Sequence, residues 1–212
     1  TVELFNGDVS LGTTTADETT GAYTITPAEL SDGDYSLTVT ATDAAGNISA
    51  ASDALSMTVD ATAPAQPAIT TTTTLTSDAT PTIEGTAEAG STVTLLSSGV
   101  AIGTTTANGD GQFSITTSTL ADSNYVLTVT ATDAAGNISA ASSALNLTVD
   151  TTAPAKPAIT TTTALTNDST PAIEGVAEAG STVTLFVDGE TTGITTTADG
   201  TTGAYTITPA EL

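Results

Sequence analysis

The chain repeats itself with a period of 90 residues. Residues 41–52 and residues 131–142 have the same sequence, ATDAAGNISAAS. The same offset relates residues 59–64 to residues 149–154 with one substitution. In an array of this kind each repeat is one structural unit that stacks on its neighbours. The fold must therefore fit within about one period of the repeat.

The segments of the form Val-Asp-x-Thr-Ala-Pro are the predicted joints between repeats. They divide the chain into the C-terminal part of one repeat, one complete repeat, and the N-terminal part of a third, at residues 1–60, 61–150 and 151–212. Because both outer repeats are partial, we expect a segment of a longer array. The prolines that follow each joint favour an extended, stiff connector over a flexible tether.

Within the complete repeat, short alternating runs of Thr, Val, Ile and Leu are separated by clusters of Gly, Asn, Asp and Ser. This pattern is typical of β-strands joined by turns. Seven strands are predicted, at residues 68–73, 80–87, 91–97, 100–106, 112–117, 124–132 and 144–149. Seven strands in about 90 residues match an immunoglobulin-like sandwich. The predicted fold class is all-β, as tandem immunoglobulin-like seven-stranded β-sandwich domains.

Strand alternation also predicts the core. In the run at 124–132, Leu127 and Val129 share one face, and Val93 and Leu95 share a face of the run at 91–97. The same pattern predicts the last five strands of a repeat within residues 1–60 and the first five strands within residues 151–212. Tyr35 and its counterpart Tyr125 follow acidic turns, where each is expected to form a tyrosine corner.

The composition excludes several classes of function. The chain has one Lys or Arg, no His, no Cys and 24 acidic residues, for a net charge of −23. Nucleophilic triads based on His or Cys and zinc sites built from thiolate or imidazole are excluded. Nucleic-acid binding is excluded because it requires many basic side chains. No apolar run is long enough to insert in a membrane, and the acids lie in solvated turns without aromatic platforms for a sugar. We expect no enzyme activity.

Three motifs together resemble the bacterial immunoglobulin-like tandem repeats of giant surface adhesins and biofilm-associated proteins. They are the joint Val-Asp-Thr-Thr-Ala-Pro, the loop Asp-Ala-Ala-Gly-Asn and the strand Thr-Pro-x-Ile-Glu-Gly. The resemblance covers the whole chain. It implies an extracellular or bacterial cell-surface location, a structural role in an adhesin or biofilm matrix protein, and calcium that stiffens the joints.

Topology predicts where the acidic residues gather. If neighbouring strands alternate in direction, the loops around residues 87–90, 107–111 and 133–137 lie at one pole of the complete repeat, beside the incoming joint. Carboxylate and amide oxygens without basic partners suit Ca²⁺, which takes six to eight oxygen ligands. The predicted ligands at the two joints and in the matching loops are Asp60, Glu88, Asp110, Asp133, Asn137, Asp150, Glu178, Asp199, Asp43, Asn47, Asp32 and Asp34.

Two readings of these acids stay open, because Asp and Asn are also favoured in turns for their backbone chemistry alone. The primary functional prediction is a calcium-stiffened rod that extends from the cell surface, whose partners are the neighbouring repeats of the same chain. One alternative is a self-assembling filament in which neighbouring chains complement each other's strands. Another is a multivalent module that binds a glycan, a receptor or ice; an outward row of Thr across one sheet would favour it.

Overall fold

The computed structural model describes residues 1–209, and its regular structure consists entirely of β-strands. The all-β fold class is therefore confirmed. None of the described residues forms a helix long and apolar enough to cross a bilayer. The chain folds as two compact units, Thr1–Asp150 and Thr151–Leu212, which we describe one at a time.

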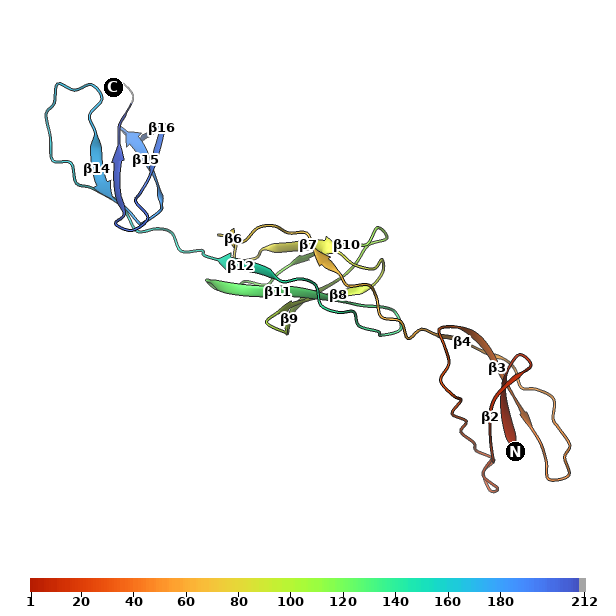
Figure 1. Ribbon diagram of the computed structural model, residues 1–212. Coiled ribbons are helices and arrows are strands. Elements are labelled where there is room, and N and C mark those ends of the chain that lie inside the picture. Colours follow the sequence, from red (N-terminus) through yellow and green to blue (C-terminus); the bar gives the residue numbers. More distant parts are fainter. Residues whose placement is uncertain (210–212) are drawn as a thin grey trace. The chain divides into compact units, whose positions relative to one another are not determined.

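The complete repeat, residues 61–150, is a two-layered sandwich (Figure 1). One sheet has the order β10-β7-β5, with β5 at Ala68–Ile69, β7 at Thr82–Thr86 and β10 at Gln112–Thr116. The other has the order β6-β12-β11-β8-β9, with β6 at Leu75–Thr76, β8 at Thr92–Ser97, β9 at Val100–Thr106, β11 at Ser123–Thr132 and β12 at Leu145–Val149. All seven predicted strand regions contain strands.

The core between these sheets consists of small aliphatic side chains and one aromatic ring, Phe113. The predicted inward faces are confirmed, since Val93, Leu95, Leu127 and Val129 are fully buried. The remaining members of this cluster with the lowest exposure are Ile83 on β7, Leu147 and Val149 on β12, and Ala107.

The first predicted strand of this repeat differs from the expectation of one continuous run at 68–73. It is divided between the sheets: β5 pairs with β7, whereas β6 pairs in parallel with β12. Thr70 and Thr71 end the first pairing, because both amides donate to the carbonyl of Glu84. The strand β9, at Val100–Thr106, pairs with β8 and therefore belongs to the larger sheet.

Residues 1–60 form a single four-stranded sheet of order β2-β1-β3-β4. Its strands are β1 (Val2–Asn6), β2 (Val9–Thr14), β3 (Gly33–Ala41) and β4 (Leu55–Val59). They correspond to β8, β9, β11 and β12. The predicted strand that corresponds to β10 is absent here, because residues 15–32 contain no regular strand.

The second unit contains the first five strands of a repeat, as predicted. Its sheets have the orders β13-β14-β17 and β15-β16. The bounds are β13 at Ala158–Ile159, β14 at Ile173–Val176, β15 at Thr182–Val187, β16 at Glu190–Thr197 and β17 at Ala204–Ile207. A small core of Val183, Ala198, Tyr205 and Ile207 joins them.

The tyrosine corners are confirmed in both repeats that contain the corresponding strand. The Tyr35 hydroxyl donates to the carbonyl of Ser31 at 2.8 Å, and the Tyr125 hydroxyl donates to the carbonyl of Ala121 at 2.9 Å. Each bond ties the start of a long strand to the loop before it. That loop carries Asp32 in the first repeat, so the corner helps to fix an acidic residue at the joint.

Candidate functional site

The joint at residues 60–62 is held on its N-terminal side by one carboxylate. Asp32 lies in the loop just before β3 and accepts two hydrogen bonds from the joint. The Ala61 amide donates to Oδ1 at 2.7 Å, and the Thr62 hydroxyl donates to Oδ2. Asp60 adds a local turn, since its Oδ1 accepts the Thr62 amide at 3.1 Å.

These hydrogen bonds also shift the pKa of Asp32. Hydrogen bonds from the Thr62 side chain and from the Ala61 amide favour the ionised carboxylate and lower the pKa of Asp32 below its ordinary value. The exposed carboxylate is therefore charged at neutral pH and is a better acceptor than a neutral group would be.

On its C-terminal side the joint is held by an amide side chain. The Nδ2 group of Asn137 donates to the backbone carbonyl of Asp60 at 2.9 Å and also to Oδ2 of Asp133 at 2.9 Å. A primary amide has two N–H donors, and here both are used. Asn137 thus joins the residue that ends the first repeat to a loop of the complete repeat.

The loop that carries Asn137 is organised around Asp133. Oδ1 of Asp133 accepts the amides of Gly136 at 2.7 Å and of Asn137 at 2.8 Å. The Asn137 side chain is the main cause that lowers the pKa of Asp133, and the loop amides add to it. Both carboxylate oxygens of Asp133 therefore accept N–H groups of its own loop.

The corresponding loop of the first repeat has the same internal geometry. Asn47 donates its amide to Oδ1 of Asp43 at 2.8 Å and its side chain to Oδ2 at 2.8 Å. The two loops differ in one bond of this asparagine, because the Asn137 side chain also donates to the Asp60 carbonyl. The loop therefore folds by itself, and the joint uses a donor that the loop already presents.

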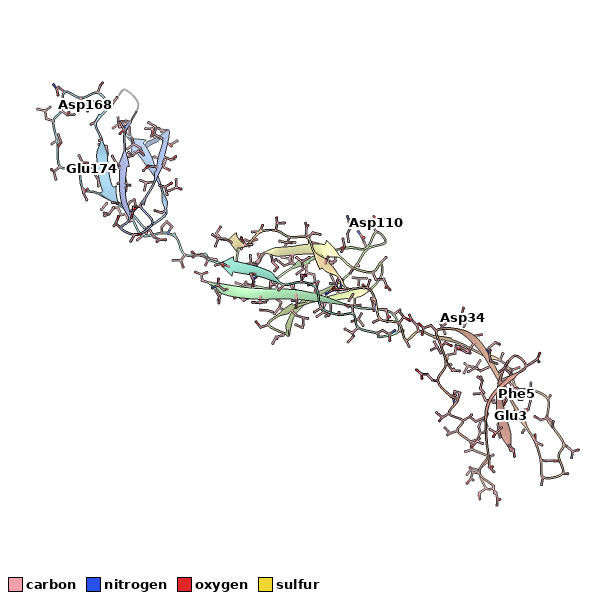
Figure 2. All side chains as sticks on the ribbon, in the orientation of Figure 1. Glu3, Phe5, Asp34, Asp110, Asp168 and Glu174 are labelled. Carbon is pink, nitrogen blue, oxygen red and sulfur yellow. The ribbon has the colours of Figure 1, made fainter. Side chains whose placement is uncertain are left out.

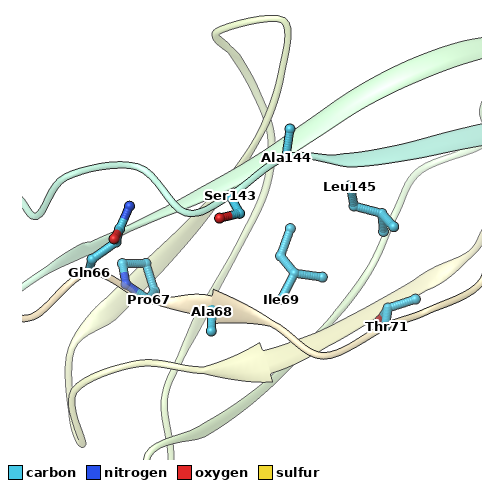
Figure 3. Close-up of a pocket in the computed structure, with 8 residues that line it drawn as sticks. All are labelled: Gln66, Pro67, Ala68, Ile69, Thr71, Ser143, Ala144 and Leu145. Carbon is cyan, nitrogen blue, oxygen red and sulfur yellow. The ribbon is translucent and has the colours of Figure 1, made fainter.

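The connector after the joint lies along the complete repeat. The Gln66 side chain donates to the carbonyl of Ala141. Beyond it, an open groove of about 390 Å³ lies between the start of β5 and the segment that leads into β12 (Figure 3). The residues drawn there are Gln66, Pro67, Ala68, Ile69, Thr71, Ser143, Ala144 and Leu145.

The other predicted ligands lie apart from this bonded set. Asp34 accepts the Thr58 hydroxyl at 2.6 Å across the β3–β4 pair, and Asp110 lies in an exposed turn in which its amide donates to Asn108 (Figure 2). Glu88 accepts two bonds from Ser91 through its backbone carbonyl. Within residues 1–209, neither Glu88 nor Asp110 makes a hydrogen bond to Asp60 or Asp133.

The remaining predicted ligands make separate contacts. The Asp150 amide donates to the Thr76 carbonyl at 3.0 Å. In the second unit, Oε2 of Glu178 accepts the Ala155 amide at 3.4 Å. Asp199 organises a turn by accepting the amides of Thr201 and Thr202, and these bonds lower the pKa of Asp199.

No group of three or more acidic residues suited to a metal occurs in the described part of the chain. Calcium takes six to eight oxygen ligands, and in this structure the carboxylates of Asp32 and Asp133 accept N–H and O–H groups. Calcium at the joints stays a prediction.

Sequence reasoning identified Asp32, Asp60, Asp133 and Asn137 as residues of the joint but did not identify how they are connected. It missed Thr62 and Gln66. The signal for Thr62 was present, because an Asp followed two residues later by Thr is typical of a local side-chain turn. Nothing in the sequence distinguishes Gln66 from an ordinary connector residue.

The fold and the joint define a class of protein built from successive β-sandwich modules. The family model for the bacterial Ig-like domain matches residues 1–61 and residues 65–151. The chain belongs to this family. Modules of this fold are typical of non-catalytic domains.

Individual relatives are more distant. Exoglucanase B of Cellulomonas fimi is 35% identical over 168 residues, which cover 74% of this chain and 15% of that protein. The chain therefore spans a small part of the length of this relative. Fibronectin(III)-like modules of Clostridium thermocellum CbhA superpose with a TM-score of 0.45 and 21% identity, over 70% of this chain and 76% of theirs. A BSP domain of a biofilm associated protein superposes with a TM-score of 0.35 and 22% identity, over 72% of this chain and 25% of that chain.

Proposed function

We propose that the chain is a structural, non-catalytic segment of an extracellular bacterial protein, and that its joints limit bending between successive modules. The observation that carries this proposal is the double attachment of residues 60–62. Asp32 holds Ala61 and Thr62 from the preceding repeat, and Asn137 holds the Asp60 carbonyl from the following repeat. A connector fixed from both sides has fewer conformations than a free tether.

Family membership and composition support the extracellular part of the proposal. Bacterial Ig-like repeats that resemble this chain occur in surface adhesins, and an acidic, cysteine-free composition suits an exported protein that does not depend on disulfides. The role in an adhesin or biofilm matrix, and the extension of the array from a cell surface, rest on the same resemblance.

In this proposal the stiffness comes from direct hydrogen bonds. The calcium hypothesis differs in one measurable respect, because a bound metal would add ligand bonds at the joint that the direct hydrogen bonds do not need. Calcium would then change the distribution of joint angles, whereas direct bonds predict a distribution that is the same with and without the ion.

The test measures the distance distribution between two spin labels, one on each side of the joint. Because the chain has no cysteine, Ser56→Cys on β4 and Ser114→Cys on β10 provide exposed labelling sites without background. In this doubly labelled chain, Asp32→Ala and Asn137→Ala should each broaden the distribution measured by pulsed electron spin resonance. An unchanged width in both variants would contradict the proposal.

Asn47→Ala is the matched control. It removes the same side-chain bond from a loop of the same sequence, but from a loop without the bond to Asp60. It should leave the width unchanged. Measurements with a chelator and with millimolar calcium complete the design: narrowing by calcium would replace the direct-bond mechanism with the calcium mechanism.

A second candidate function is multivalent binding to a surface with regularly spaced hydroxyl groups. The outer face of the larger sheet carries rows of Thr on three adjacent strands: Thr94 pairs with Thr104 and Thr130, and Thr92 pairs with Thr106 and Thr132. The name of the Cellulomonas fimi relative makes an insoluble glucan the first surface to test. Co-sedimentation with cellulose that Thr94→Lys abolishes would support this function, and no co-sedimentation of the parent chain would exclude that ligand.

A further inference from the structure

In the complete repeat, the chain enters and leaves at opposite ends of β11. It enters beside the C-terminal end of this strand, where Asn137, in the loop that follows β11, donates to the Asp60 carbonyl at 2.9 Å. It leaves beside the N-terminal end, since Val149 lies opposite Ser123. Tension that reaches the repeat through its two ends therefore acts along the strands of the sandwich.

The strands that meet this tension form a parallel pair. β6 lies beside β12 (Figure 1) and runs in the same direction, whereas the other strand pairs of the repeat are antiparallel. The Thr148 amide donates to the Thr74 carbonyl at 2.8 Å, and the Asp150 amide donates to the Thr76 carbonyl at 3.0 Å. We call β6, β12 and these two hydrogen bonds the clamp.

The direction of the pair determines how tension acts on the clamp. β12 runs toward the point where the chain leaves the repeat, and β6 runs the same way. Tension pulls β6 back toward the entry point and β12 onward to the exit. The two strands are then sheared along each other, and both hydrogen bonds carry the force together. In an antiparallel pair of terminal strands, the pulled ends would lie side by side and the bonds would open one after another.

The hydrogen bonds of the clamp carry this force because β6 has little apolar burial of its own. Leu147 and Val149 on β12 are 2% and 1% exposed, so β12 is anchored in the core. Leu75 on β6 is 66% exposed. β6 therefore depends on its bonds to β12 to stay in place.

The pairing of β5 with β7 lies ahead of the clamp and protects much less of the chain. When it opens together with the Gln66 contact, residues 67–73 are released, which is about 25 Å of extended chain. Residues 77–147 lie between β6 and β12, and their full extension is about 250 Å. The two events are therefore distinguishable by length, and the clamp controls the unfolding of the sandwich.

We propose that the complete repeat resists tension along the chain, and that the clamp is the contact that sets this resistance. The source of the tension is the structural role proposed for the chain, but the resistance is a property of one repeat and is measured without that role. A weak clamp would leave the proposed function of the joints intact, and an unchanged spin-label distance distribution would leave the clamp intact.

The experiment pulls single molecules of the 212-residue chain in two directions through DNA handles on cysteines. Because the chain has no cysteine of its own, the handles attach only where they are placed. Ala63→Cys with Ala153→Cys, at equivalent positions of the two joints, loads the clamp in shear. Ser77→Cys with Ala153→Cys applies force at one end of the clamp and opens it bond by bond. At equal loading rate, shear should need at least about twice the force, because two hydrogen bonds must break together.

Asp150→Pro tests the clamp itself, because proline has no N–H group to donate to Thr76. The residue before it, Val149, is already in a strand, which is the conformation that a following proline favours. The force in shear should fall by about half, since one of the two hydrogen bonds remains. Ala65→Pro is the matched control: it places a proline in the pulled connector, outside the clamp, and should leave the force unchanged. Circular dichroism of both variants establishes that their strands are intact.

Three outcomes would overturn the proposal. The first is an equal force in the two pulling directions, and the second is an unchanged force in shear for Asp150→Pro. The third is a highest force in shear that accompanies the release of about 25 Å instead of about 250 Å of chain, because β5 and β7 would then be the resisting pair.

Discussion

At the scale of single residues, the charged form of Asp32 is the basis of the N-terminal half of the joint. Hydrogen bonds from Thr62 and Ala61 lower the pKa of Asp32. A carboxyl group whose pKa is lower in the folded state than in the unfolded state stabilises the folded state at pH values above the unfolded pKa. This stabilisation is lost as the pH falls through the folded pKa. The joint should therefore be intact at neutral pH and should loosen in acid, below about pH 4.

The Ala61 amide reports this titration directly. In nuclear magnetic resonance spectra, its chemical shift should titrate with a midpoint below the ordinary value for an aspartate, because its N–H donates to Asp32. In Asp32→Asn the same amide should not titrate in this range. A midpoint at or above the ordinary value would show that the two hydrogen bonds are not formed in solution.

Thr117 provides a test of packing without charge. Its side chain is buried, and its hydroxyl is the buried polar side-chain atom without a hydrogen-bond partner in the described structure. An unsatisfied buried hydroxyl costs about 1–3 kcal/mol. Thr117→Val keeps the shape and removes this cost, so the free energy of unfolding should rise by about 1 kcal/mol in urea. A loss of that size would show that the hydroxyl has a partner in solution.

At the scale of the elements, the motif Thr-Pro-x-Ile-Glu-Gly requires glycine for steric reasons. A Cβ atom on Gly85 would lie 2.1 Å from the Ala68 carbonyl oxygen and 2.4 Å from the Phe113 ring. Gly175 is confined in the same way by Ala158 and Tyr205. The absence of a side chain allows β5 and an aromatic ring to approach the middle strand of the sheet.

Gly85→Ala should therefore destabilise the complete repeat by about 1–3 kcal/mol or more, as overpacked cores do. Gly109→Ala is the control, because a Cβ at that loop position meets nothing within 4 Å. Thermal unfolding followed by circular dichroism compares the two. Equal stability of both variants would show that β5 can move away from β7 without cost.

The same elements show what could be predicted from sequence. Alternation identified the strands and the inward faces, because small aliphatic residues at a period of two have few other ways to be buried. It could not identify the division of the first strand between sheets, which depends on where Thr70 and Thr71 find an acceptor. It also placed a strand that corresponds to β10 within residues 1–60, whereas residues 15–32 contain no regular strand.

The joint was predictable to a similar degree. The sequence places acidic and amide residues at the same pole, but the kind of contact depends on the direction of individual N–H groups. In the case of Asn137, an amide that organises its own loop also donates to the Asp60 carbonyl. No composition argument distinguishes that arrangement from a set of metal ligands.

Equivalent positions in partial and complete repeats allow a further comparison. Leu147→Ala removes a buried side chain and should lower the free energy of unfolding by about 2–5 kcal/mol. Met57→Ala, at the equivalent position of the first repeat, should cost much less in the dilute chain, because Met57 is partly exposed. Urea unfolding at low concentration compares them. Similar costs would show that the face of β4 is already covered in the monomer.

At the scale of the whole molecule, charge opposes contact between chains. With a net charge of −23 and one basic residue, any two copies repel each other. The Debye length is about 10 Å at 0.1 M salt and about 3 Å at 1 M, so the repulsion is screened as salt increases. Contact between apolar side chains carries no charge for salt to screen. Association should therefore become stronger between 0.05 and about 0.5 M sodium chloride.

Sedimentation at matched ionic strength separates screening from specific binding of calcium. If salt acts only by screening, sodium chloride and calcium chloride solutions of equal ionic strength should give nearly the same association. A much larger effect of calcium would mean that carboxylates such as Asp60 and Glu88 bind the ion between chains or at the joints, although the described structure brings no three acids together. Weaker association at high salt would show that charge pairing, and not apolar contact, holds the copies together.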